Sequence, residues 1–458
     1  MKPALLLSLA LLSLALLPSS LPAAAERPNV LIILADDLGF ADIGVHGCKD
    51  IPTPHIDALA ERGVRCTSGY SSHPYCSPMR AGLMACRYQH RFGYVTNVAY
   101  DPANTQIGLP ASEKTIAKRL QEAGYHTGMA GKWHLGASHA HHPNRRGFEF
   151  FYGFLGGGHQ YFDVDLTKPM GEGYFDTLQH NGTPKDLDGY LTDVLSEEAV
   201  GFIERSKDDE RPFFFYLAYN APHAPMQAPE ADLQKFASIP DKKRRAYAAM
   251  VHAMDRGIGQ VLAALDASGQ RENTIVFFLS DNGGPTSANA SSNTPLRGFK
   301  GDVFEGGVRV PFIVSWPGKL PEGTTYDHPV ISLDVSRTAL ALGQAKIVPK
   351  LEGKNLMPFL SGSSAGPPHD ALYWKSGDKW AVRSGDWKLL REKGMTGTRL
   401  FQLSNDISEK DDRSSSDPGL AEKLGAAYKV WNQDNLPALF PSYREYHEKK
   451  REFYRGLK

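Results

Sequence analysis

Continuous apolar runs of strand length recur along the chain, and their alternation with helical patterns is the strongest constraint on its fold. The runs cover residues 29–34, 126–130, 212–219 and 274–279. Helical patterns separate them, at residues 54–62, 112–123 and 242–267. Strands without polar alternation are typical of a parallel sheet buried on both faces. The pattern therefore predicts an α/β fold, with a large, mostly parallel or mixed sheet between layers of helices.

A smaller second unit is predicted near the C-terminus. Sequence rich in Gly, Ser and Pro between residues 343 and 370 indicates a boundary. Beyond it lie strand candidates at 371–375, 380–383, 387–390 and 399–403, then a helix at 419–432 and a charged, aromatic-rich tail. The turn Ser384-Gly385-Asp386 is typical of a hairpin. We expect a catalytic domain at 26–345 and, at 346–458, an α+β subdomain built on a short antiparallel sheet.

Residues 1–25 have the pattern of a cleavable secretory signal peptide. Lys2 precedes an apolar run over residues 4–17, and small residues follow up to Ala25. The alternative, an uncleaved anchor, would need a longer apolar run. Because no cysteine follows the run directly, a lipoprotein is not expected. The chain is predicted to be secreted or periplasmic, without a membrane anchor.

The overall charge balance gives no reason to expect a nucleic-acid partner. Lys+Arg and Asp+Glu are equal at 51 each, so the chain lacks the general positive charge that draws proteins to nucleic acids or acidic membranes. Any preference for an anion must therefore arise locally.

Acidic and amide residues directly follow two of the predicted strands. Asp36 and Asp37 come after the first strand, and Asp281 and Asn282 come after the strand at 274–279. Alone, an Asp-Asp pair is more often a loop or a helix cap. The carboxyl ends of strands in an open α/β sheet form the ligand-binding edge, however, so these side chains are expected to meet. Such carboxylates repel one another unless a cation is bound, and all-oxygen donors favour Ca²⁺ or Mg²⁺ over Zn²⁺.

Basic residues lie at other strand ends or in Gly- and Pro-rich turns, and they are Arg80, Lys132, His134, His223 and Lys300. Each alone is more often a surface or capping group. Together they could neutralise an anionic substrate and transfer a proton to a leaving oxygen. The loop at residues 156–161, which contains His159, is rich enough in Gly and aromatic residues to line a sugar pocket, or it is a simple turn.

The four cysteines, Cys48, Cys66, Cys76 and Cys86, lie close together in the sequence. In an exported chain, two disulfides are the default expectation. If Cys76 has a chemical role, one of the other three is left without a partner. The pairing therefore stays open at this point.

The stretch from Cys76-Ser77-Pro78-Met79-Arg80 to Arg87 resembles the signature of the type I, formylglycine-dependent sulfatases, which have an alkaline phosphatase-like fold. Blocks similar to that family occur in its order at residues 35–39, 131–136, 220–225, 280–284, 296–301 and 305–311. One departure is Ala85-Cys86, where the family usually has Thr-Gly. The Cys-x-Pro-x-Arg core that the modifying enzyme needs is intact, so modification is expected.

The resemblance implies that a formylglycine-generating or equivalent sulfatase-maturing enzyme oxidises Cys76 to formylglycine, whose aldehyde hydrates to a geminal diol. One hydroxyl attacks the sulfur and displaces the alcohol, and the other then expels sulfate and restores the aldehyde. By the same resemblance, residue 76 binds a metal, Ca²⁺ rather than Mg²⁺, together with Asp36, Asp37, Asp281 and Asn282. Asp281 is also implied as the acceptor of a diol proton.

The resemblance also implies roles for the basic residues. Arg80 and Lys132 would stabilise the charge of the diol and of the sulfate. His223 and Lys300 would contact the substrate and protonate the leaving oxygen. His134 would assist the collapse of the covalent sulfate.

The implied substrate is a sulfated carbohydrate, as for secreted enzymes similar to arylsulfatases or N-acetylgalactosamine-6-sulfatases. Neither the sugar, the sulfated position nor the oligomeric state follows from the sequence. Two alternatives stay open: a phosphate or phosphonate monoester hydrolase on the same fold, and a non-catalytic binder of sulfated glycans with Cys76 unmodified.

Overall fold

The structure, a computed structural model, describes residues 27–165, 167, 174 and 176–456. The predicted signal peptide at 1–25 lies outside these residues. A large central sheet contains β1 (Asn29–Ala35), β2 (Gly63–Cys66), β4 (His126–Lys132), β5 (Phe150–Phe154), β6 (Leu178–His180), β7 (Thr183–Lys185), β8 (Phe213–Ala218), β9 (Thr274–Ser280), β10 (Phe312–Ser315) and β11 (Thr324–Tyr326). Its order is β11-β2-β10-β9-β1-β8-β4-β5-β6-β7.

The prediction of a mostly parallel or mixed sheet is confirmed. The central strands β9, β1, β8, β4 and β5 are parallel to one another. Strand β10 pairs antiparallel with β9, and β6 pairs antiparallel with β5, so the sheet becomes mixed toward both edges. The predicted central strands begin at or next to the expected residues, whereas β2, β5 and β10 were not predicted.

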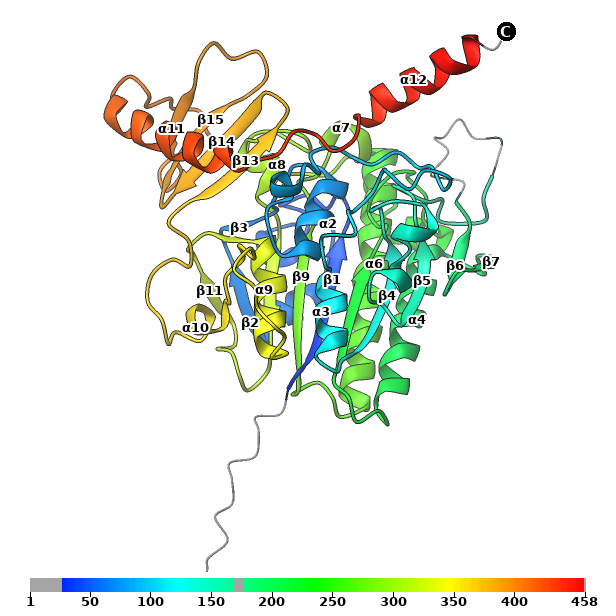
Figure 1. The fold of residues 1–458 in the computed structure, drawn as a ribbon. Coiled ribbons are helices and arrows are strands. Elements are labelled where there is room, and N and C mark those ends of the chain that lie inside the picture. Colours follow the sequence, from blue (N-terminus) through cyan, green and yellow to red (C-terminus); the bar gives the residue numbers. More distant parts are fainter. Residues whose placement is uncertain (1–26, 166, 168–173, 175, 457–458) are drawn as a thin grey trace, which may run out of the picture.

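Helices cover both faces of the sheet (Figure 1). The side chains of Val30, Ile32 and Leu34 in β1 face the core cluster that includes residues of α2 (Cys76–Ala85), α3 (Ile116–Glu122) and α9 (Ser332–Leu342). The alternate residues Leu31 and Ile33 face the cluster of α1 (Pro54–Glu61), α4 (Leu191–Ser206) and α6 (Lys242–Ala267). A strand buried on both faces needs apolar residues at every position, which accounts for the continuous run in the sequence.

Helix α6 has the predicted bounds, but α3 begins at Ile116 rather than at residue 112. The cause is Thr115, whose hydroxyl oxygen accepts a hydrogen bond from the backbone N–H of Lys118 at 3.0 Å and so caps the helix there. Shorter helices lie in the connections: α5 (Glu230–Lys235), α7 (Thr286–Asn289), α8 (Glu305–Val308) and α10 (Met357–Leu360).

A separate antiparallel sheet lies toward the C-terminus and contains β13 (Leu372–Ser376), β14 (Lys379–Ser384), β15 (Trp387–Arg391) and β16 (Arg399–Gln402). Strands β14 and β15 form the expected hairpin. Helix α11 (Pro418–Gln433) covers this sheet, with Tyr428 stacked on Trp380 at 4.1 Å between ring centroids. Strands β3 (Gly69–Tyr70) and β12 (Val330–Ile331) form a separate two-stranded parallel sheet.

The structure adds one element and corrects one expectation. The charged tail forms a helix, α12 (Tyr443–Gly456), which extends away from the body of the molecule in Figure 1. All four cysteines carry free thiols, so the default expectation of disulfides is wrong. Among the residues that the structure describes, no helix is long and apolar enough to cross a membrane.

Candidate active site

The predicted acidic residues meet at the carboxyl ends of the central strands. Strands β1 and β9 run parallel with Ala35 opposite Ser280, so the residues that follow them lie side by side. Carboxylate oxygens of Asp36, Asp37 and Asp281 all lie within 4.8 Å of one another, and all three side chains are buried.

Oxygen atoms in this cluster lack hydrogen-bond partners. The Asn282 side-chain amide donates to Asp37 Oδ1 at 2.6 Å. The Asn282 amide oxygen and Asp36 Oδ1 are buried, and neither has a hydrogen-bond partner within the described part of the chain. Because a buried acceptor without a partner is costly, these oxygens indicate a place for an electropositive group. An all-oxygen donor set fits a hard divalent cation such as Ca²⁺ or Mg²⁺.

The backbone at Asp37 is unusual. Its φ is 65°, in the left-handed region that costs a non-glycine residue roughly 1–2 kcal/mol. The surrounding contacts hold this conformation: the Asp37 N–H donates to Asp281 Oδ1 at 3.2 Å, and the Asn289 side-chain amide donates to the Asp37 carbonyl oxygen at 3.1 Å. His134 also lies in the left-handed region, with φ 56°. Such strain is concentrated at functional sites in many proteins.

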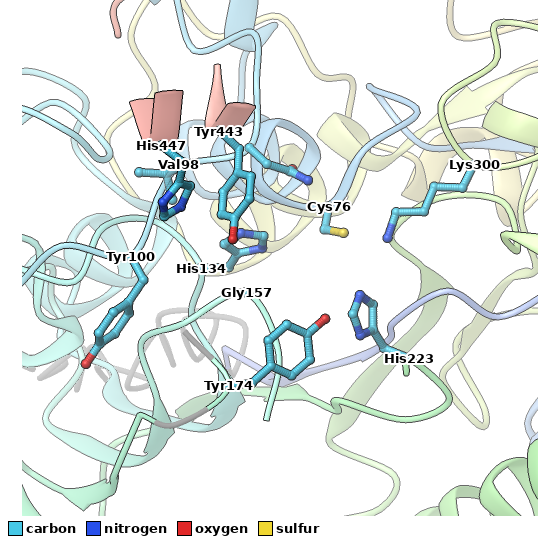
Figure 2. A pocket seen from close by; sticks show the side chains of 11 residues that line it. Cys76, Val98, Tyr100, His134, Gly157, Tyr174, His223, Lys300, Tyr443 and His447 are labelled. Carbon is cyan, nitrogen blue, oxygen red and sulfur yellow. The ribbon is translucent and has the colours of Figure 1, made fainter. Parts of the chain in front are cut away.

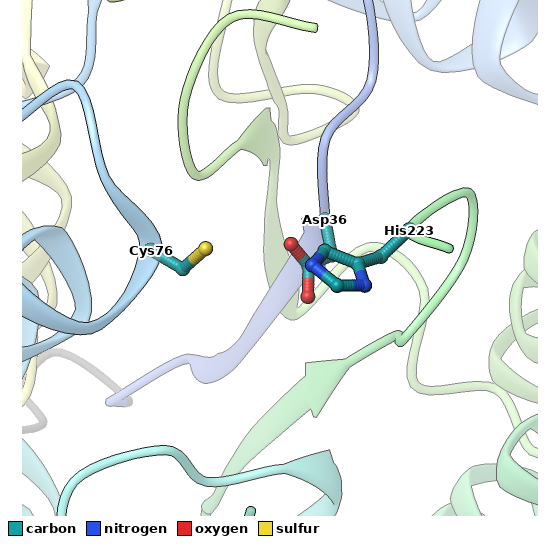
Figure 3. Close-up of side chains that lie close together, drawn as sticks. All are labelled: Asp36, Cys76 and His223. Carbon is teal, nitrogen blue, oxygen red and sulfur yellow. The ribbon is translucent and has the colours of Figure 1, made fainter. Parts of the chain in front are cut away.

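Cys76 is the first residue of α2 and is almost completely buried. Figure 3 shows its thiol facing Asp36 and His223, and one ligand atom of each residue lies within 4.8 Å of the others. Such a mixture of sulfur, nitrogen and oxygen would suit zinc if the thiol ionised. Burial, however, raises the pKa of the Cys76 thiol to about 11 despite the nearby Lys132 and Lys300. The thiol is therefore neutral, and a neutral thiol is both a weak nucleophile and a weak metal ligand.

Arg80 and Lys132 are fully buried beside the carboxylate cluster. The Arg80 guanidinium donates to Asp281 Oδ2 at 2.8 Å and to the Lys132 carbonyl oxygen at 3.1 Å. The Lys132 ammonium contacts the Asp36 carboxylate directly. Burial raises the pKa of Asp36, but Lys132, His223 and Arg80 together lower it well below its usual range.

Asp281 shows the opposite shift. Burial and the negative charge of Asp36 raise the pKa of Asp281 to about 7, and Arg80 and Lys132 offset only part of this effect. Two neighbouring carboxylates thus differ strongly in proton affinity, an arrangement that is common at catalytic sites.

Four of the predicted residues line one cavity of about 310 Å³: Cys76, His134, His223 and Lys300. Figure 2 shows Lys300 and His223 on one side of Cys76. The Lys300 ammonium lies 2.7 Å from Asp37 Oδ1, and His223 Nε2 lies 3.6 Å from Asp37 Oδ2. His223 Nδ1 lies 2.7 Å from the Ala224 carbonyl oxygen, so it carries a proton and leaves Nε2 to face the cavity.

His159 does not join this cavity. Its ring is buried, with Nδ1 2.6 Å from the Gln160 carbonyl oxygen and Nε2 2.9 Å from the Asp176 carbonyl oxygen. Both ring nitrogens therefore face backbone carbonyl oxygens, and the neutral ring donates to one of them. Gly157, from the same loop, does line the cavity.

The sequence did not predict several other lining residues, which are Asn97, Val98, Tyr100, Tyr174, Tyr443 and His447. It also missed Ser77, whose hydroxyl donates to the His134 carbonyl oxygen at 2.7 Å and whose N–H donates to Asn97 Oδ1 at 3.1 Å. Only Ser77 had a usable signal, since it lies inside the conspicuous stretch that begins at Cys76.

The C-terminal part of the chain holds the loop that carries Lys300. The Arg297 guanidinium donates to the Glu409 carbonyl oxygen at 2.7 Å, and the Val303 N–H donates to Glu392 Oε2 at 2.9 Å. The Lys379 ammonium donates to the Gly301 carbonyl oxygen. The position of Lys300 therefore depends on residues far from it in the sequence.

Comparisons of the sequence with known families agree with this geometry. The family model described as "Sulfatase" matches residues 28–345. A second model, "N-sulphoglucosamine sulphohydrolase, C-terminal", matches residues 299–417. Mouse arylsulfatase J is 31% identical over 93% of this chain and 79% of its own length. The dog N-acetylgalactosamine-6-sulfatase is 33% identical over 80% of this chain and 72% of its own length.

Solved structures are also similar to this chain. The crystal structure of Ps i-CgsB in complex with k-i-k-neocarrahexaose superposes with a TM-score of 0.86 at 40% identity, covering 90% of this chain and 94% of that one. The PsFucS1 sulfatase from Pseudoalteromonas sp. gives a TM-score of 0.75 at 26% identity, over 90% of this chain and 91% of that one. With these matches and the family model spanning most of its length, the chain belongs to the sulfatase family and is a sulfuric ester hydrolase.

Proposed function

We propose that this sulfatase removes sulfate from a sulfated carbohydrate, using formylglycine at position 76 as its nucleophile. The observation that carries the proposal is that Cys76, His134, His223 and Lys300 line one cavity beside the carboxylate cluster. Its volume of about 310 Å³ lies at the lower end of the range for small-molecule sites, which suits one sulfated sugar unit. The 40% identity to a protein solved with a carrageenan-type hexasaccharide supports a sulfated oligosaccharide as the substrate.

The unmodified Cys76 thiol is a weak nucleophile for this reaction because burial keeps it protonated. Oxidation of Cys76 by a sulfatase-maturing enzyme removes that difficulty. The hydrated aldehyde of formylglycine supplies an oxygen nucleophile for sulfur and can release sulfate afterwards by returning to the aldehyde.

The cation is proposed to be Ca²⁺, with Mg²⁺ as the less favoured choice. Asp36, Asp37, Asp281 and Asn282 would hold it together with residue 76, since two of their oxygens lack partners in the described residues. A bound divalent cation would lower the pKa of a hydroxyl group and offset the negative charge of the sulfate.

Arg80 and Lys132 have a supporting electrostatic role in this proposal. Both are fully buried and hydrogen-bonded to Asp281 and Asp36, so they limit repulsion between those carboxylates. Fixed positive charges in a site without water stabilise developing negative charge more strongly than in solution. Asp281 would take up a proton from the nucleophile.

His223 and Lys300 would bind the sulfate group and protonate the leaving oxygen, since both reach the cavity next to Asp37. His134 would assist release of the covalently bound sulfate from residue 76. His159 is given no role at this cavity, because its ring lies outside it and faces backbone carbonyl oxygens.

The enzyme is further proposed to be exported, with residues 1–25 as its signal peptide. Residues 26–345 would act as the catalytic domain and residues 346–458 as the C-terminal subdomain that holds the loop of Lys300.

Mass spectrometry of the peptide that contains Cys76 tests the nucleophile, because conversion of cysteine to formylglycine lowers the peptide mass. The protein should be produced with a sulfatase-maturing enzyme and assayed on k-i-k-neocarrahexaose and on a phosphate monoester, with Cys76→Ala as the control. We expect the modified peptide, sulfate release by the wild type alone, and much slower phosphate release. Full activity with an unmodified thiol, or a preference for the phosphate ester, would overturn the proposal.

A further inference from the structure

Helix α12 forms one wall of the cavity although it lies at the far end of the chain. Tyr443 and His447 project from its first turns into the same cavity as Cys76 (Figure 2). They are four residues apart, so they lie on one face of the helix. Their rings are 4.3 Å apart between centroids.

Specific contacts fix the base of α12 beside the helix of the nucleophile. The N–H groups of Leu436 and Leu439 donate to the carbonyl oxygens of His90 and Gly93 at 2.9 and 2.7 Å. The buried Phe440 packs edge-on against Tyr94, whose hydroxyl in turn lies 2.7 Å from Ser77 Oγ. The approach of α12 to the cavity is therefore built into the fold.

A further contact secures the helix itself. The Tyr446 hydroxyl donates to the Asp101 carboxylate, and its ring packs against the main core. This contact holds the first turns of α12 against the body of the protein, and with them Tyr443 and His447. The side chain of Tyr443 is 46% exposed, which is unusual for an aromatic ring with only a structural role.

The cavity has two chemically different ends. In Figure 2, Lys300 and His223 lie on one side of Cys76, and Tyr100, Tyr443 and His447 lie on the other. The first end is suited to an anion. The second end is aromatic, and it also holds His447, whose Nε2 is buried and has no hydrogen-bond partner within the described residues.

We propose that Tyr443 and His447 of α12 form the subsite that recognises the sugar ring of the substrate, so that the terminal helix determines specificity. The inference rests on the proposed sulfated-carbohydrate activity. Aromatic side chains offer a rigid apolar surface with a polar edge, which matches the apolar face and hydroxyl rim of a sugar. The His447 ring lines the cavity, and a rotation of this half-buried side chain would bring its unpartnered Nε2 to a sugar hydroxyl, while the sulfate end of the cavity stays unchanged.

The test compares two substrates that share the sulfate group but differ in what carries it. Wild type, Tyr443→Ala and His447→Ala are assayed on k-i-k-neocarrahexaose and on 4-nitrophenyl sulfate, which is too small to need the aromatic end. We expect kcat/KM on the oligosaccharide to fall at least about tenfold in each variant, mainly through KM, as one lost aromatic or hydrogen-bond contact in a pocket implies. The change on 4-nitrophenyl sulfate should stay below about threefold.

Two further variants serve as controls. Arg444→Ala lies on the same helix, but its side chain is 87% exposed and pairs with Glu448, so activity on both substrates should be unchanged. Tyr446→Phe removes the bond to Asp101 and should weaken oligosaccharide hydrolysis less than Tyr443→Ala does.

The outcomes separate the inference from the proposed function. If the wild type hydrolyses both sulfates and the α12 variants lose activity on both equally, α12 acts on the reaction itself and the inference is wrong. Unchanged activity of the variants on the oligosaccharide also contradicts it. If the wild type hydrolyses only 4-nitrophenyl sulfate and none of a panel of sulfated oligosaccharides, the proposed carbohydrate substrate fails instead.

Discussion

The ammonium of Lys388, in the C-terminal sheet, lies 2.8 Å from the carboxylate of Glu305, which opens helix α8 after the loop of Lys300. Lys388 also lies 3.0 Å from Glu409, and all three side chains are fully buried. Tyr70 donates its hydroxyl to Glu305 at 2.6 Å. This buried charge cluster joins the C-terminal sheet to the part of the chain that positions a cavity residue.

Replacing Lys388 with methionine should destabilise the protein strongly. The change leaves two carboxylates buried without their shared cation, and breaking a buried ion pair from one side costs about 3–5 kcal/mol. Chemical denaturation measures the loss. Lys114→Ala is the control, because its pair with Glu122 is half exposed and should contribute less than about 1 kcal/mol. Equal effects of the two substitutions would contradict the importance of the cluster.

The same cluster predicts a pH dependence for Glu409→Gln. Burial and the charge of Glu305 raise the pKa of Glu409 from 4.5 to about 7, although Lys388 lowers it. A raised carboxyl pKa favours the folded state fully below the ordinary value near 4.5, and that contribution is lost as the pH rises through about 7. Glutamine cannot ionise, so the Tm of the variant relative to wild type should increase between pH 5 and pH 8.

Exposed Glu422→Gln, on α11, controls for the loss of one carboxylate. Its Tm difference from wild type should stay constant over the same pH range. A Glu409→Gln difference that is also constant would show that Glu409 keeps an ordinary proton affinity in the folded protein.

The parts of the site that the sequence predicted are those set by local pattern. The run at Asn29–Ala35 is apolar at every position because β1 is buried on both faces, and the sheet then brings Asp36 beside Asp281. Parallel strands put their carboxyl ends at one edge, so the residues after β1 and β9 were expected at the same edge, and they meet because these two strands are neighbours in the sheet. This reasoning needs no knowledge of the rest of the chain.

The remaining parts depend on contacts between distant segments, which local pattern does not encode. Two buried partners of Glu305, Lys388 and Glu409, come from more than 80 positions away. Tyr443 begins a charged stretch in which aromatic residues recur at helical spacing, a pattern the prediction did not use, whereas its approach to Cys76 depends on contacts between distant segments. His159 lies outside the cavity of Cys76, with its ring nitrogens facing the carbonyl groups of Gln160 and Asp176, so its sugar contact stays a prediction.

Removing the proposed cation should destabilise the enzyme as well as inactivate it. Without a cation, Asp36, Asp37 and Asp281 repel one another in a buried cluster. Dialysis against EGTA should lower the Tm, and Ca²⁺ should restore it more effectively than Mg²⁺. Ca²⁺ at a concentration of 100 times its Kd would raise the unfolding free energy by about 2.7 kcal/mol. Ca²⁺ should not raise the Tm of an Asp37→Ala variant. If neither EGTA nor Ca²⁺ changes the Tm of the wild type, the proposed cation site is excluded.

Gly131 should not tolerate alanine. Its φ of +109° is strained for any other residue, and a Cβ there would lie 1.9 Å from the Ala218 carbonyl oxygen on the neighbouring strand. Since the obstructing atom belongs to the backbone and not to a flexible side chain, we expect a loss of about 3 kcal/mol or more in unfolding free energy. Gly419→Ala in α11 meets no atom within 4 Å and should instead stabilise by about 0.4–1 kcal/mol. If Gly131→Ala lowers the unfolding free energy only slightly, the backbone at the end of β4 can shift to accommodate a Cβ.

Replacing His223 with alanine should affect substrates according to their leaving groups. A positioned general acid contributes roughly 10²–10⁴-fold when the leaving oxygen is basic. Alkyl sulfates should therefore lose most of their turnover, whereas 4-nitrophenyl sulfate, whose leaving group is already stable, should lose much less. Single-turnover rates on both substrates measure the difference. Tyr161→Phe removes the hydroxyl that donates to the His223 carbonyl oxygen at 2.8 Å. Its loss of turnover should be smaller than that of His223→Ala, and alkyl sulfates should again be affected more than 4-nitrophenyl sulfate. Equal losses on alkyl and aryl sulfates would assign His223 to sulfate binding alone.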